Sequence, residues 1–168
     1  MCCVPETQIV LIDGRSGAGK TDLANRLASI WGCPVVHLDD AYPGWDGLRA
    51  GRDAIIRDVV VPLAHGDEGH YVRWDWEMGA PTETIVVPSV PLIIIEGCGI
   101  LTPLSAQYAD VALWVECADD IRRERAVRRD GHATAENFDR WALQEDDVIA
   151  TDFPMALADE ILRTDDEA

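Results

Sequence analysis

The chain has 168 residues, which suits one compact domain, and 48% of them are hydrophobic, enough for a buried core. Thirty-one acidic side chains against 14 basic ones give a formal net charge of −17. This excess argues against a nucleic-acid partner, because Lys and Arg contacts to phosphate supply much of such affinity. No apolar run approaches the ~20 residues that span a membrane, and the N-terminus lacks the pattern of a signal peptide. We expect one cytoplasmic domain over residues 1–168, without a membrane partner.

The first third of the chain alternates a strand, a helix and a second strand. Gln8–Asp13 is a short apolar run before glycine, as expected of a buried parallel strand. Lys20–Trp31 has apolar residues at helical spacing, and Gly32 follows as a stop signal. Pro34–Leu38 predicts the second strand, and Asp39–Gly51 predicts a surface loop because it is rich in Gly, Pro and Asp.

The rest of the chain continues this alternation. In chain order we expect a helix at Arg52–Ala64, extended pieces at Tyr71–Trp76 and Thr84–Val87, strands at Pro91–Glu96 and Val111–Glu116, helices at Asp119–Asp130 and Ala135–Ala150, and a last strand at Glu160–Arg163. Strands that alternate with helices favour an α/β sandwich around a five-stranded parallel sheet.

Lysine and cysteine usage also bear on chemistry. The 14 basic residues include a single lysine, Lys20, and the rest are arginines. A general preference for arginine explains the scarcity of lysine. It does not explain why the exception lies where a flexible ammonium group is chemically useful. The five cysteines show no metal-ligand spacing, so we expect ordinary thiols in a reducing compartment.

Residues 14–21 form a complete G-x-x-x-x-G-K-[ST] motif, here called the phosphate loop. Its members are Gly14, Arg15, Ser16, Gly17, Ala18, Gly19, Lys20 and Thr21. Glycines let backbone N–H groups curl around a phosphate, and the following helix directs its positive N-terminus at the same anion. Lys20 can reach the β- and γ-phosphates, and the Thr21 hydroxyl can bind Mg²⁺. Because the motif lies between a predicted strand and a predicted helix, nucleotide binding is favoured over a glycine-rich turn without a ligand.

The segments after the phosphate loop resemble the uridine kinase branch of the P-loop kinases over most of the chain. His37–Tyr42 (HLDDAY) is similar to the family signature D-x-[FY]-[FY] at Asp39 and Tyr42, with Ala41 in place of the usual aromatic residue. The resemblance implies that Asp39 orients the acceptor hydroxyl and accepts its proton. Asp40 is the alternative base, and capping of a turn is the alternative to any catalytic role.

A second point of resemblance lies at the predicted strand that ends in Glu96. Ile93–Gly97 (IIIEG) looks like the family's strand that closes in Glu-Gly. A carboxylate there can hold Mg²⁺ directly or through water, and burying it without a cation would be costly. The resemblance implies a metal role for Glu96, together with Thr21 and Asp39.

The arginine-rich segment 120–130 (DIRRERAVRRD) is similar to the family's lid helix, D-x-R-x-x-R-R-x-x-R-D. On a helix Arg122, Arg125 and Arg129 share a face, so they could converge on phosphate oxygens. The resemblance implies a lid over about residues 119–133, with Arg122 and Arg125 at the transferred phosphate and Arg129 at the nucleotide. A solvated, ion-paired helix face is the alternative.

The acceptor pocket is the least defined part of the sequence. Its candidates follow Asp39 or lie in the segment 71–77, and they are Asp40, Tyr42, Trp45, Arg73, Trp74, Asp75 and Trp76. Aromatic rings could stack on a planar base, while Asp75 or Arg73 fixes a sugar or an acidic group. Core packing is the equal alternative for Trp74 and Trp76, which share one face of a strand. Arg140 and Gln144, four residues apart on a predicted helix, could face the nucleotide.

The resemblance implies an ATP- and Mg²⁺-dependent kinase that moves the γ-phosphate to a hydroxyl of a small molecule, with a nucleoside as the leading acceptor, in a monomer or homodimer. Sugars, acids, nucleotides and cofactor precursors are alternative acceptors, because the acceptor region matches the family loosely. Two further classes of protein fit the phosphate loop: a regulatory module that uses ATP as a switch, and a fold that binds nucleotide only structurally. A guanine-reading N-K-x-D motif is impossible, since it needs a second lysine.

Overall fold

The computed structural model describes residues 7–165 and contains a five-stranded parallel sheet in the order β2-β5-β1-β6-β7. Its strands are β1 (Gln8–Gly14), β2 (Val35–His37), β5 (Leu92–Glu96), β6 (Val111–Glu116) and β7 (Glu160–Arg163). The predicted sheet is confirmed, and each strand agrees with its predicted bounds to within one residue. The apolar runs located these strands well because buried parallel strands carry apolar residues toward both faces.

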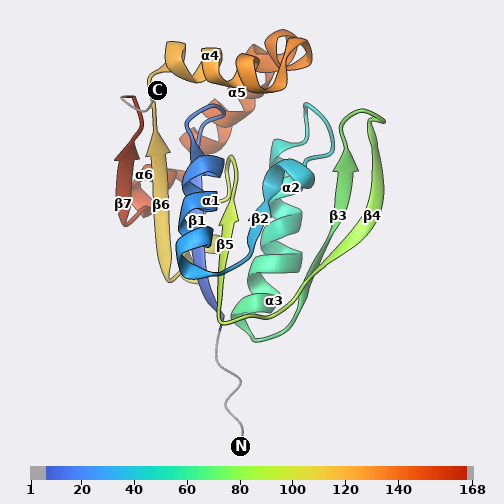
Figure 1. Ribbon diagram of the computed structural model, residues 1–168, viewed down its shortest axis with the longest axis vertical. Helices are drawn as coiled ribbons and strands as arrows, with labels where there is room; N and C mark the ends of the chain where they lie inside the picture. The colour runs from blue at the N-terminus through green and yellow to red at the C-terminus, as the bar shows by residue number, and fades with distance from the viewer. Residues whose placement is uncertain (1–6, 166–168) are drawn as a thin grey trace, which may run out of the picture.

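Helices cover both faces of this sheet (Figure 1). They are α1 (Lys20–Trp31), α2 (Leu48–Ile55), α3 (Val61–Ala64), α4 (Asp119–Asp130), α5 (His132–Asp152) and α6 (Pro154–Leu157), with single turns at η1 (Leu38–Asp40) and η3 (Ser105–Gln107). Alternate residues of β1 belong to different core clusters: Ile9 and Leu11 pack with α2, α3 and α5, whereas Val10 and Ile12 pack with α1. This arrangement is the three-layer sandwich expected from the sequence.

The helix predicted at Arg52–Ala64 begins earlier, at Leu48, and is interrupted by the π-helical turn η2 (Ile56–Val60). The predicted loop at Asp39–Gly51 is correspondingly shorter. The π-turn directly precedes Pro62, whose ring nitrogen has no hydrogen to donate to the turn before it. Because α2 begins at Leu48, the helical run starts four residues before the predicted start at Arg52.

The strands β3 (Gly69–Asp75) and β4 (Ala80–Val87) pair antiparallel in a separate two-stranded sheet. They contain most of the extended pieces expected at Tyr71–Trp76 and Thr84–Val87. The hairpin stands on the side of α2 and α3, away from β6 and β7 (Figure 1).

Helix α4 and the start of α5 cross the end of the sheet toward which its strands point (Figure 1). This is the edge where the phosphate loop follows β1 and where Glu96 closes β5. Ligands of open α/β sheets bind at this carboxyl edge. Among residues 7–165, no helix combines the length and the apolar character needed to cross a lipid bilayer.

Replacing Ile95 with alanine should destabilise the protein by about 2–5 kcal/mol, because its side chain is fully buried in the central sheet and truncation leaves a cavity. Urea unfolding followed by circular dichroism measures this loss. Ile30→Ala is the matched control, since Ile30 is 76% exposed and should change stability by less than about 0.5 kcal/mol. Equal effects of the two substitutions would contradict this assignment of the core.

Candidate functional site

A cavity of about 630 Å³ opens at the carboxyl edge of the sheet. It is lined by residues from the phosphate loop, from the ends of β2 and β5, from the β3–β4 turn and from α4 and α5: Ser16, Gly17, Gly19, Lys20, Thr21, Asp22, His37, Asp39, Asp40, Tyr42, Trp45, Trp76, Glu96, Cys98, Arg129, Asp130, Ala133, Thr134, Phe138 and Trp141. Its volume lies in the range typical of small-molecule sites. Phosphate-loop residues, three carboxylates singled out from the sequence (Asp39, Asp40 and Glu96) and several aromatic side chains therefore share one cavity.

The phosphate loop is built so that α1 starts at Lys20 and points its N-terminus into the cavity. Gly19 precedes the helix with a φ of 99°, a left-handed conformation that favours glycine. The Lys20 ammonium donates to the Arg15 carbonyl oxygen at 3.0 Å and lies 3.4 Å from the Cys98 sulfur. Burial opposes the charge of Lys20, but Cys98 and the surrounding acids outweigh this effect and raise its pKa. Lys20 is therefore a charged side chain held beside the loop.

Three polar side chains meet where β2 and β5 end. The parallel register sets His37 beside Glu96, and His37 Nδ1 lies 2.7 Å from Glu96 Oε1. The Thr21 hydroxyl donates to the same carboxylate oxygen at 3.0 Å. Burial alone would raise the pKa of Glu96, but the hydrogen bond from His37 and the charge of Lys20 lower it; the same hydrogen bond raises the pKa of His37. Glu96 is thus an ionised, oriented carboxylate next to the phosphate loop.

This oxygen donor set suits Mg²⁺. Thr21 and Glu96 offer a hydroxyl and a carboxylate oxygen within hydrogen-bonding distance of each other. Across the described residues, no three His, Cys, Asp or Glu side chains converge into a metal site of their own. That is compatible with Mg²⁺, which usually takes one or two protein oxygens and completes its shell with water and substrate phosphates.

Asp39 and Asp40 occupy η1 and both line the cavity. The Asp39 side chain is exposed to the cavity, yet the surrounding walls reduce its hydration, and this desolvation together with the charge of Glu96 raises its pKa. Trp76 Nε1 donates to the Asp39 backbone carbonyl at 2.8 Å, which ties η1 to the β3–β4 turn. Both members of the acidic doublet remain available as bases.

Aromatic rings of Tyr42, Trp45, Trp76 and Trp141 form one wall of the cavity. The centroid of Trp45 lies 5.0 Å from that of Trp76 and 6.2 Å from that of Trp141, and Tyr42 meets Trp141 edge to face at 4.9 Å. The Tyr42 hydroxyl is buried and donates to the Cys98 carbonyl oxygen at 2.8 Å. Tyr42 is therefore a buried residue that packs against Trp141, whereas Trp76 is 39% exposed and accessible to a ligand.

Three acceptor candidates lie elsewhere on the hairpin. Arg73 pairs with Glu83 across the two strands at 2.6 Å, and Asp75 accepts two backbone N–H groups of the following turn. Trp74 packs near Gly44. None of the three lines the cavity, although Trp76, the next residue along the chain, does.

Arg140 and Gln144 also differ from their expected position at the nucleotide. Arg140 forms an ion pair with Asp46, and Gln144 donates to the Trp45 carbonyl oxygen at 2.6 Å. They fix the segment before α2 to α5. Their four-residue spacing correctly gave them a common face of a helix, but that face meets a loop of this chain.

The three lid arginines do not converge on the cavity as the sequence suggested. Only Arg129 lines it, where its guanidinium donates to Asp130 at 2.7 and 2.6 Å. Arg122 is buried and Arg125 donates to the Thr164 carbonyl oxygen at 2.8 Å. The reason is the close approach of α4 to the phosphate loop: a Cβ at Gly17 would collide with the carbonyl oxygen of Arg122. The face shared by Arg122 and Arg125 is therefore covered by the loop and by the end of β7.

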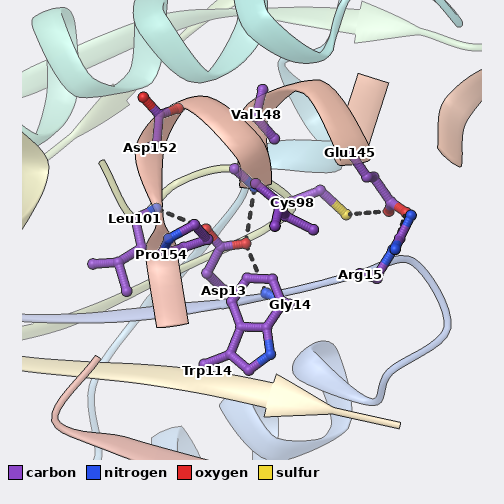
Figure 2. Close-up of a pocket in the computed structure, with 12 residues that line it drawn as sticks. Asp13, Gly14, Arg15, Cys98, Leu101, Trp114, Glu145, Val148, Asp152 and Pro154 are labelled. Carbon is purple, nitrogen blue, oxygen red and sulfur yellow. Dashed lines mark hydrogen bonds and ion pairs between the residues drawn. The ribbon is translucent and has the colours of Figure 1, made fainter. Parts of the chain in front are cut away.

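A group of residues behind the phosphate loop was not predicted from the sequence (Figure 2). The buried Asp13 carboxylate accepts N–H groups from Gly14 at 2.6 Å, from Gly99 at 2.8 Å and from Leu101 at 2.8 Å. It joins the start of the loop to the segment that follows β5. One signal was present: Asp13 is the polar end of an apolar run, directly before the first glycine of the motif.

Cys98 and Glu145 complete this group, and the Cys98 sulfur lies 3.4 Å from a carboxylate oxygen of Glu145 (Figure 2). Burial raises the pKa of the Cys98 thiol well above its ordinary value. The pocket that these side chains share with Asp13 has a volume of only about 10 Å³, too small for a nucleotide. For Glu145 the signal was its spacing from Phe138 and Trp141, which puts all three on one face of α5.

Burial raises the pKa of Asp13 to about 6 from an ordinary value of 3.8, despite the opposing N–H groups. Between about pH 4 and 6 the folded chain keeps a proton that the unfolded chain has lost, so Asp13 reduces stability by roughly 3 kcal/mol as the pH rises through this window. We expect Asp13→Asn to be less stable than the wild type at pH 4. The difference in free energy of unfolding between the two proteins should be smaller at pH 7. Urea unfolding at each pH measures it.

Asp67→Asn, at an exposed position, controls for the exchange of a carboxylate for an amide. If the difference in free energy of unfolding between Asp13→Asn and the wild type stays constant from pH 4 to pH 7, burial does not raise the pKa of Asp13.

No protein-family profile and no curated protein sequence matches the chain. Solved structures match it over nearly its whole length. A possible uridine kinase from Bacillus stearothermophilus is 20% identical, with a TM-score of 0.63 over 93% of this chain and 88% of that chain. A proposed fructose transport system kinase from Silicibacter sp. TM1040 is 20% identical, with a TM-score of 0.61 over 94% and 90% of the two chains.

Shikimate kinase from Acinetobacter baumannii, solved with shikimate, is 14% identical, with a TM-score of 0.57 over 98% of this chain and 87% of that chain. At such identities a likeness shows the fold. The chain has the α/β fold of the P-loop kinases and resembles the uridine kinase-like structures within it.

Proposed function

We propose that the protein is a kinase that transfers the γ-phosphate of ATP to a hydroxyl group of a small molecule. The observation that carries this proposal is one cavity that Lys20 and Thr21 of the phosphate loop, Asp39 and the aromatic wall line together. Phosphoryl transfer depends mainly on positioning and on stabilisation of charge, and a cavity of this composition supplies both.

The phosphate side of the reaction falls to the loop and its neighbours. Backbone N–H groups at the start of α1 bind the phosphates, and the Lys20 ammonium stabilises charge on the transferred group. Thr21 and Glu96 would hold Mg²⁺, which when bound neutralises charge on the phosphate oxygens. His37 orients Glu96 through their 2.7 Å contact.

The acceptor hydroxyl is oriented by Asp39, which accepts its proton late in the transfer. The raised pKa of Asp39 makes this carboxylate a better base than an ordinary aspartate. Asp40 lines the same cavity and is the alternative. Arg129 is the lid arginine assigned to the phosphates, while Arg122 and Arg125 contribute through the loop and β7 against which they lie.

A nucleoside is the acceptor that the cavity favours. Among the described residues that line it, the permanently charged bases are Lys20 and Arg129, and the proposed mechanism assigns both to the phosphates of the nucleotide. A carboxylate or phosphate on the acceptor would need a further base with which to pair. Flat, exposed aromatic surface such as Trp76 suits a planar ring. Neutral sugars and cofactor precursors match the charge but use less of this wall.

The test is mass spectrometry of the products formed with ATP, Mg²⁺ and a pooled library of nucleosides, nucleotides, sugars, acids and cofactor precursors. We expect one phosphorylated product, from a nucleoside, and none with Lys20→Ala, whose fold is checked by circular dichroism. A phosphorylated acid or sugar would contradict the nucleoside as acceptor but support the proposed kinase activity. ADP release without any phosphorylated acceptor would favour a nucleotide switch and contradict the proposal.

Asp39→Asn should lower kcat by about 10²–10⁴-fold, because an amide cannot accept the proton, while the Kd of MgATP changes little. Asp40→Asn is the matched control and should keep kcat within a few-fold of the wild type. Steady-state kinetics and nucleotide titration give the two quantities. The opposite result, in which Asp40→Asn is the inactive variant, would move the base to Asp40.

A further inference from the structure

The backbone of Ser16, within the phosphate loop, is hydrogen-bonded by side chains of two helices. Its N–H donates to Glu145 Oε1 of α5 at 2.6 Å, and its carbonyl oxygen accepts from Arg122 Nη1 of α4 at 2.9 Å. Both side chains are buried. Contacts between residues 106 and 129 positions apart thus hold the two peptide units on either side of the Ser16 Cα atom.

Glu145 lies at the centre of a compact charged group (Figure 2). Its second oxygen accepts from Arg15 Nε at 3.2 Å, Arg122 Nη1 lies 4.0 Å away, and the Cys98 sulfur lies 3.4 Å from its first oxygen. A buried carboxylate is tolerated when it is paired in this way. Arg15 and Arg122 each have a second, exposed partner, Asp146 and Asp119, so Glu145 is the buried carboxylate that the two arginines share. Glu145 therefore fixes the outer surface of the loop by charge as well as by a hydrogen bond.

Arg122 is not optimised for stability. Of the buried side-chain nitrogens and oxygens in the described residues, its Nε is the one without a hydrogen-bond partner. A buried donor without a hydrogen-bond partner destabilises the fold. The same guanidinium, of Arg122, donates to the Ser16 carbonyl oxygen, and the backbone of α4 lies against Gly17. This indicates that its contact with the loop, rather than stability alone, determines its position.

We infer that Glu145 and Arg122 are positioning residues that hold the phosphate loop in its nucleotide-binding form. By engaging the backbone N–H and the carbonyl oxygen of Ser16, they leave the residues that follow, Gly17 to Thr21, to face the phosphates. The inference rests on the proposed function only in requiring that the loop binds a nucleotide.

The test is isothermal titration of MgADP into the full-length protein and into Glu145→Gln, which keeps the shape of the side chain and removes its charge. We expect the Kd of MgADP to rise about tenfold. Asp146→Asn is the matched control, because Asp146 also pairs with Arg15, at 2.5 Å, but is exposed and does not touch Ser16. Its Kd should change by less than twofold.

Thermal unfolding without nucleotide separates positioning from structure. A lower Tm for Glu145→Gln with an unchanged Kd would mean a structural role only and would overturn the inference, as would equal changes in Kd for the two variants. If Glu145→Gln does not fold, Glu145→Asp takes its place; its shorter side chain should weaken MgADP binding, and wild-type affinity would overturn the inference. Absence of MgADP binding by the wild type would overturn the proposed function as well.

Discussion

The geometry of the site depends on the Asp13 carboxylate, which ends β1 and accepts three backbone N–H groups. These bonds fix the start of the phosphate loop to the segment that follows β5. Because β5 ends in Glu96, the same bonds set the distance between the loop and the carboxylate proposed to hold Mg²⁺. The interaction requires burial of an acid, and its raised pKa reflects the cost. An amide such as Asn could not accept all three N–H groups in this way, because its side-chain nitrogen only donates.

The other buried charges follow the same principle, since each has a compensating partner close by. Lys20 lies among acids, Glu96 accepts from His37, and Glu145 accepts from Arg15 near the guanidinium of Arg122. In a chain with a net charge of −17, acidic residues are plentiful and supply the counterions for a few buried cations. The edge of the sheet can then carry positive charge for phosphates without an uncompensated group in the interior.

Much of this arrangement could be predicted because it is local or follows from strand order. Apolar runs located the parallel strands, the phosphate loop is contiguous in sequence, and the carboxyl ends of β2 and β5 brought Asp39 and Glu96 to one edge. Helical spacing was less informative. It showed that Arg122 and Arg125 share a face of α4, but not that the phosphate loop and β7 cover that face. The positions of such side chains depend on packing between distant elements, which no short motif encodes.

Helix α5 shows how a chain of this length combines two tasks. One of its faces carries Phe138 and Trp141, which line the cavity, and one turn further Glu145, which accepts the backbone N–H of Ser16 in the phosphate loop. These residues lie three and four positions apart, the spacing that aligns side chains along a helix. A shift of α5 that repacked the aromatic wall would also move the carboxylate that fixes the loop. In the proposed kinase, residues assigned to the nucleotide and residues assigned to the acceptor would therefore be carried by one helix.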